Sequence, residues 1–152
     1  MERKSHLSIT GLALRNWAIA QVQDSLAVGV LWLIGLRIVG VRFSFLWAAL
    51  AALLGIVPHF GPILGLIGPF LTAGIASRDW RHPLGVLIVY LVIATVDGFL
   101  IQPYIMRRTA KVPVWASILA PIALGILWPF WGIFLAPPLL AVVYGHKAHS
   151  AR

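Results

Sequence analysis

Two long stretches without charge limit what this chain can fold into. Residues 112–145 carry no acidic, basic or histidine side chain, and residues 43–77 carry only His59. Over the whole chain 11% of residues are charged, against about 25% in soluble domains. About 20 apolar residues cross a bilayer, and a helix satisfies its own backbone there. The sequence therefore predicts an all-α integral membrane protein, which we take as a single membrane domain over residues 1–152.

The charged residues are mostly basic and lie at the ends of the apolar runs. The chain has 12 Lys and Arg against 4 Asp and Glu, a net charge of +8. The basic residues do not alternate with aromatics on a polar face, so we expect no nucleic-acid partner. They fit loops held in the cytoplasm. No small-residue cleavage site follows the basic start of the chain, and we expect no cleaved signal peptide.

Breaks in the apolar pattern predict the helices of the first half. One long helix is expected over Leu14–Val39, with its first turns at the membrane interface. The apolar arms Phe45–Val57 and Ile63–Ala76 then flank the break Pro58–Pro62. Each arm is about 20 Å long as a helix, shorter than a hydrocarbon core of about 30 Å. We therefore predict a re-entrant helical hairpin that leaves the membrane on the side where it entered.

The second half repeats this plan. Leu84–Gln102 is long enough to span, Pro103–Pro113 reads as a basic loop, and Val114–Tyr144 is broken at Trp128–Gly132 before Pro137-Pro138 and a polar tail. The start of this block, Pro113-Val114-Trp115-Ala116, is similar to Phe45-Leu46-Trp47-Ala48. Two hairpins around one span suggest an inverted repeat, in which interrupted segments mark the substrate site of transporters.

The basic residues also predict the topology. If both hairpins return to their side of entry, the Lys and Arg residues divide eight to four between the two faces. The smaller group is Arg37, Arg42, Arg78 and Arg81. If each broken block crosses once, the division is seven to five. The positive-inside rule favours the first arrangement, so we expect both termini in the cytoplasm and the chain in a bacterial inner membrane.

Three segments resemble motifs of the autoinducer-2 exporter family, in the same order. The run Gly55–Ile63 is similar to the family's Pro-aromatic-Ile-Gly-Pro hairpin, and Phe134–Leu139 is similar to its Leu-Leu-Ala-Val-Pro-Leu close. Between them, the family's acidic-Gly-Asn segment and its Pro-x-Ile-Met-Gly-Arg continuation resemble a series of residues here: Asp97, Gly98, Pro103, Ile105, Met106 and Arg108.

The resemblance implies a multi-pass transporter that exports a small metabolite or the quorum-sensing signal autoinducer-2, with ion coupling as an option. The family's members are about twice as long, so the chain would correspond to the carboxy-terminal half of such a transporter. It would form a homo-oligomer or associate with the missing amino-terminal helices. Two alternatives stay open. One is a truncated, non-transporting membrane subunit or scaffold, and the other is a cation/proton antiporter.

Asp97 is the first candidate for the coupling site. We place it inside a spanning helix, about five residues from its cytoplasmic end. A carboxylate at that depth needs a cavity, a partner or a proton. The competing interpretation is an ion pair with Arg107 or Arg108 that anchors the helix end. Pro103 and Arg108 follow Asp97 in the family-like motif and join it as candidates.

The hairpin break supplies the other substrate-path candidates, Pro58, His59, Gly61 and Pro62. Proline and glycine there free backbone groups, which are tolerated at membrane depth only in protein or in a watery cavity. His59 could instead be solvated at the opposite surface. Gly61 and Gly65, with Gly68 one turn on, have the spacing of close helix contacts, and we favour packing over ligand binding for them.

Two further groups have simpler explanations. Asp24, near Gln21 and Gln23, could line a pathway, but an interfacial helix start explains it better. The aromatic cluster Trp128, Phe130 and Trp131 fits an interfacial belt better than a ligand platform.

The sequence carries no sign of an enzyme. The four acids do not pair at helical spacing, and there is no His-Glu-x-x-His motif, no phosphate loop and no cysteine. We therefore expect no catalytic residue, metal or cofactor, and name the lipid bilayer and a small-molecule or cation substrate as partners.

Overall fold

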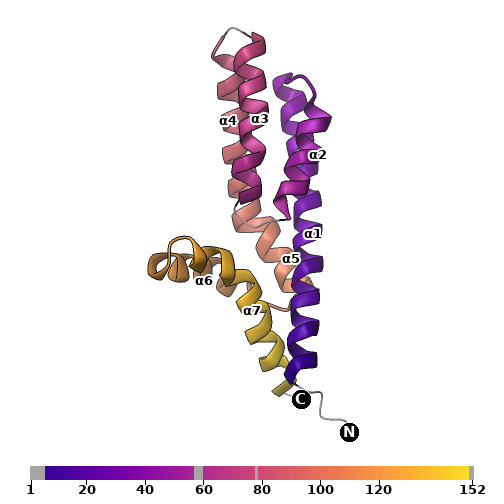
Figure 1. Ribbon diagram of the computed structural model, residues 1–152, viewed down its shortest axis with the longest axis vertical. Helices are drawn as coiled ribbons and strands as arrows, with labels where there is room; N and C mark the ends of the chain where they lie inside the picture. The colour runs from indigo at the N-terminus through magenta and orange to yellow at the C-terminus, as the bar shows by residue number, and fades with distance from the viewer. Residues whose placement is uncertain (1–5, 57–59, 78, 151–152) are drawn as a thin grey trace. The chain divides into compact units, whose positions relative to one another are not determined.

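The computed structural model describes residues 6–56, 60–77 and 79–150, and every regular element in these ranges is helical (Figure 1). The all-α prediction is confirmed for this part of the chain. The elements are α1 (His6–Val39), α2 (Ser44–Gly55), α3 (Phe60–Ser77), α4 (Arg81–Val96), the π-helical turn η1 (Asp97–Ile101), α5 (Gln102–Thr109), α6 (Val114–Leu127) and α7 (Trp131–Ser150).

Two helical stretches are long and apolar enough to cross a membrane, by length and composition. They are Ser8–Val39 and Arg81–Thr109, and the second runs through α4, η1 and α5. The basic loop predicted from Pro103 is therefore wrong, because helix continues to Thr109. Pro103 stands in the first turn of α5, where the missing N–H of proline is tolerated best.

The chain divides into two compact units. Unit 1 comprises residues 1–21 and 99–152, and unit 2 comprises residues 22–98. That both belong to one membrane domain stays a prediction.

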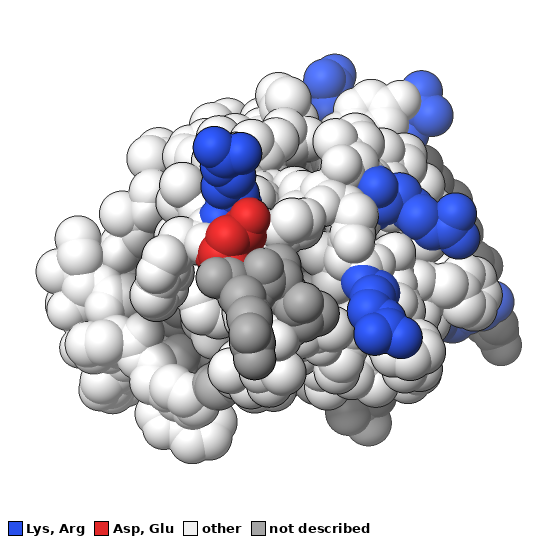
Figure 2. Space-filling view, turned by 90° about the horizontal axis from the view of Figure 1, so that it is seen from above, with Lys and Arg blue, Asp and Glu red and all other residues white. Residues whose placement is uncertain are grey.

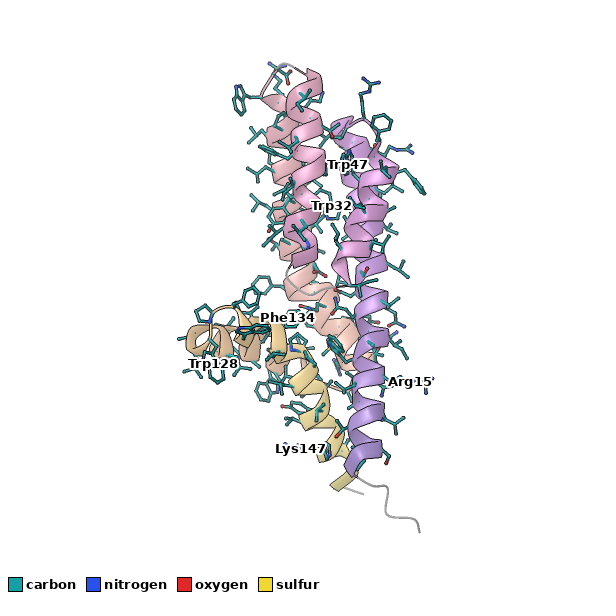
Figure 3. The ribbon with its side chains drawn as sticks, viewed as in Figure 1. Arg15, Trp32, Trp47, Trp128, Phe134 and Lys147 are labelled. Atoms are coloured by element: carbon teal, nitrogen blue, oxygen red, sulfur yellow. The ribbon has the colours of Figure 1, made fainter. Side chains whose placement is uncertain are left out.

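Unit 2 is a bundle made of the later part of α1 with α2, α3 and α4 (Figure 1). Its core includes Val28, Leu36, Val86 and the fully buried Trp32. Figure 3 shows Trp32 and Trp47 among these helices. The Trp32 ring lies 6.5 Å from the ring of Tyr90 on α4, centroid to centroid. The contact between Trp32 and Tyr90 thus joins the first helix of the unit, α1, to its last helix, α4.

The hairpin of α2 and α3 closes on a face of small residues. A Cβ added at Gly61 would overlap the backbone of Gly55, and one at Gly68 would overlap the ring of Trp47. At Gly65 it would come within 2.9 Å of the Ala51 Cβ. The close-packing role predicted for these glycines is confirmed.

The break between the two arms differs from the prediction. Gly61 and Pro62 belong to the first turn of α3, where a proline ring replaces an N–H that has no partner within the helix. Pro58 and His59 lie outside the described residues. The second arm is consequently longer than expected, with 18 residues from Phe60 to Ser77.

Unit 1 contains the start of α1 with α5, α6 and α7. Its core includes Ala20, Met106, Val112, Ala116 and Ala141. The predicted break at Trp128–Gly132 is present as a turn between α6 and α7, although Gly132 already lies within α7.

Helix α7 continues through Pro137 and Pro138 to Ser150. Ala136 and Pro137 are buried. In apolar surroundings a helix still satisfies more backbone groups than any other local structure, so the missing N–H groups are tolerated.

Candidate functional site

Asp24 is buried in the middle of α1. Its side chain is 6% exposed, and the following Ser25 is 3% exposed. The interfacial interpretation of this residue is therefore wrong, because an interfacial carboxylate would be solvated. The earlier turns of α1 lengthen the helix to His6, which moves Asp24 to mid-helix.

Asp97 stands where α4 ends and the π-helical turn begins. Single π-turns within helices are often found at functional sites. Since helix continues to Thr109, Asp97 lies near the middle of the apolar stretch Arg81–Thr109. The predicted position close to the helix end is corrected by about two helical turns.

The two carboxyl groups meet inside unit 2. The side chains of Asp24 and Asp97 are within hydrogen-bonding distance of each other. The Oδ1 atom of each is buried and has no hydrogen-bond partner. Ionised carboxylates only accept hydrogen bonds, and like charges at this distance repel strongly. Binding of a proton or another cation would relieve this repulsion.

The tip of the first hairpin packs beside this pair. Ser25 Oγ donates a hydrogen bond to the backbone oxygen of Ala52, on the last turn of α2. A Cβ on Gly55 would lie 3.5 Å from Ser25 Oγ, and Gly55 in turn contacts Gly61. The end of the hairpin at Gly55 therefore packs against Ser25 of α1, the residue that follows Asp24 of the carboxyl pair.

The other predicted site residues that the structure describes do not lie together. Gly61 lies at this end of the hairpin, as a packing contact. Pro103 is buried in unit 1, and Arg108 is exposed with its guanidinium 4.7 Å from the centre of the Tyr104 ring. Their roles in a substrate path stay predictions.

The aromatic turn between α6 and α7 remains exposed. The rings of Phe130 and Trp131 are 5.1 Å apart and nearly perpendicular, and Figure 3 shows Trp128 at the same end of unit 1. The interfacial position predicted for this cluster stays a prediction.

Sequence reasoning underrated Asp24, although a signal was present. Asp24 and Asp97 are the only acids within the two candidate spans, and buried acids of separate membrane helices tend to pair. No group of three or more His, Cys, Asp or Glu that could hold a metal ion occurs within the described ranges.

Comparison with known proteins places the chain in a family. Residues 2–150 match the model of the AI-2E family transporters. The AI-2 transport protein TqsA of Escherichia coli is 29% identical over 128 residues, which cover 84% of this chain and 37% of TqsA. No solved structure matches the chain.

Two further relatives carry names of transport proteins. YhhT of Escherichia coli is 30% identical over 118 residues, covering 78% of this chain and 34% of YhhT. YrrI of Bacillus subtilis is 26% identical over 140 residues, covering 92% of this chain and 39% of YrrI. The chain thus spans about a third of the length of the curated relatives that it matches. With nearly its whole length matched by the family model, the chain is a membrane protein of the AI-2E transporter family.

Proposed function

We propose that this chain forms the ion-coupled translocation site of a small-metabolite exporter in the inner membrane. The observation that carries the proposal is the contact between Asp24 and Asp97 on two candidate membrane spans, beside the tip of the α2–α3 hairpin. Intramembrane acids of this kind are typical of proton and cation relays.

The proposed mechanism uses the charge of the pair as a switch. With one shared proton the two carboxyls are joined by a hydrogen bond, and the hairpin tip packs closely through Gly55 and Gly61. When the proton leaves, the two negative charges repel and admit water or a cation. This change loosens the tip and opens the site to the other side, which is alternating access at a carboxyl pair.

One relative and the chemistry of the carboxyl pair support the two proposed substrate classes. One relative is named for AI-2 transport, a small signal molecule, and we propose a small metabolite of this kind for the present chain. Cation/proton exchange is the second candidate, favoured by the two unpartnered Oδ1 atoms, which are hard oxygen ligands suited to a small cation.

Flux through proteoliposomes tests the proposal. Labelled autoinducer-2, and separately sodium driven by a pH gradient, would be measured with the wild-type chain, Asp97→Asn and Asp24→Asn. We expect each variant to lower the flux of the transported substrate at least tenfold. The amide of asparagine does not bind and release a proton, so the pair can no longer share one. The matched control is Asp79→Asn, which changes an exposed acid between α3 and α4.

The outcomes separate the alternatives. Metabolite flux without sodium dependence supports export, and sodium flux alone supports the antiporter. If the folded wild-type chain carries neither, the self-sufficient transporter is wrong and the chain is a non-transporting subunit. Because the chain spans a third of its relatives, the same assay with added partner helices would then identify a split transporter.

A further inference from the structure

An apolar groove runs along unit 2 between α1 and α2. It has a volume of about 240 Å³ and opens to the outside. Its lining is apolar throughout and consists of Leu26, Gly29, Val30, Leu33, Phe45, Ala48, Ala49 and Ala52. A Cβ on Gly29 would come within 2.6 Å of the Ala52 Cβ, so close helix contact forms the floor.

Both walls of the groove lead to an arginine at the same end. On α1, Leu26, Val30 and Leu33 lie on one helical face, and Arg37 is one turn further along that face. On α2, the wall begins at Phe45, three residues after Arg42. The last turn of α1, with Arg37, and the α1–α2 loop, with Arg42, therefore add two positive charges at the end of an uncharged groove.

The loop geometry turns Arg42 outward. Val41 and Ser44 are buried, and Ser44 Oγ donates a 2.8 Å hydrogen bond to the Val41 backbone oxygen. Between them, Arg42 and Phe43 are exposed, and Phe43 has a left-handed backbone with φ of 59°. Arg37 and Arg42 are both exposed, and no ion pair of either is found within the described ranges. Figure 2, which looks onto this end, shows basic side chains standing out from a largely uncharged surface.

We propose that this groove binds one anionic phospholipid, with its phosphate between Arg37 and Arg42 and an acyl chain along α1 and α2. Arginine binds phosphate oxygens through paired, charge-assisted hydrogen bonds. The charge at the end distinguishes this occupant from a second copy of the chain, whose apolar helix would leave both guanidinium groups unpaired.

Native mass spectrometry of the purified full chain tests the site. Phosphatidylglycerol and phosphatidylcholine with the same acyl chains would be added separately. We expect the wild-type chain to retain one phosphatidylglycerol with at least tenfold preference. Arg37→Gln/Arg42→Gln should lose that preference, because each charged hydrogen bond lost weakens binding by roughly tenfold. Arg81→Gln is the matched control, since it removes an exposed arginine at the start of α4 and should keep the preference.

A groove-filling variant separates the acyl-chain contact from the charge contact. Ala49→Phe places a ring in the groove and should lower phosphatidylglycerol retention at least fivefold, while the melting temperature stays within a few degrees of wild type. Three results would overturn the proposal. They are equal retention of both lipids by the wild type, unchanged retention by Ala49→Phe, and displacement of the lipid by inorganic phosphate alone. A dimer that Ala49→Phe abolishes, with no lipid retained, would show a second copy as the occupant instead.

Discussion

The buried carboxyls of Asp24 and Asp97 should affect the stability of the fold and the proposed transport in different ways. In the Asp24–Asp97 pair each side chain accepts hydrogen bonds, and only a bound proton lets one of them donate. The amide of an asparagine would donate permanently. The pair is thus better suited to exchanging a proton than to holding the bundle together.

This difference predicts opposite effects of two substitutions at one position. Asp24→Asn should keep or raise the melting temperature, because its amide donates to Asp97, although flux is lost. Asp24→Ala should lower the unfolding free energy by about 1–3 kcal/mol, since it leaves Asp97 buried without its partner. Thermal unfolding in detergent measures both. Equal destabilisation by the two variants would contradict the hydrogen-bonded pair.

Asp79, in the loop before α4, forms an exposed contact with His82 in the first turn of α4. The His82 Nδ1 and Asp79 Oδ1 atoms are 3.0 Å apart. The hydrogen bond from the His82 side chain lowers the pKa of Asp79. Because the folded pKa is below the unfolded value of about 3.9, the contact stabilises the fold above that pH. Its contribution is lost as the pH falls through the folded pKa.

A carboxyl NMR titration checks this shift. The midpoint of Asp79 should lie below its ordinary value in the wild-type chain and move up in His82→Ala. A midpoint that is the same in both proteins would show that His82 has no part in the shift.

The close contact between α2 and α3 decides how the first hairpin folds. Gly61 lets the first turn of α3 touch the backbone of Gly55, and this contact holds the tip beside Ser25. Its spacing with Gly65 is visible in the sequence, but the partner helix is not. Only the packed hairpin shows which residues the glycines approach.

Two glycine substitutions on α3 should therefore differ. Gly61→Ala should lower the unfolding free energy by about 1–3 kcal/mol, because its Cβ overlaps backbone that cannot move away. Gly74→Ala is the control, since the nearest atom to its Cβ is the Pro83 Cγ at 3.7 Å, an ordinary contact. This control should be neutral or stabilising by up to about 1 kcal/mol. Equal loss in the two variants would contradict the close contact at Gly61.

The membrane topology is a property of the whole molecule. The chain has no cysteine, so a single introduced cysteine reports the side of the membrane on which it lies. The re-entrant hairpin predicts that Phe43 and Trp80 face the periplasm and that Arg107 faces the cytoplasm. In unit 2 the α1–α2 and α3–α4 loops lie at the same end of the bundle (Figure 1), which supports the proposal.

Single-cysteine labelling in intact cells measures this arrangement. Phe43→Cys and Trp80→Cys should react with an impermeant maleimide, and Arg107→Cys should react only after the membrane is permeabilised. If each broken block crossed the membrane once, Phe43→Cys and Trp80→Cys would instead label from opposite sides.

The sequence by itself determined the all-α class and the presence of two long apolar helices, but not the bounds of those helices or of the Pro58–Pro62 break. The class and the presence of the helices depend on a local property, namely uncharged length. The tertiary structure decided the rest. It carried helix through Pro103, where local rules predicted a loop, because apolar surroundings favour a hydrogen-bonded backbone. It also brought Asp24 of α1 to Asp97 at the start of η1, since pairing between distant residues depends on how helices pack and leaves no periodic signal along the chain.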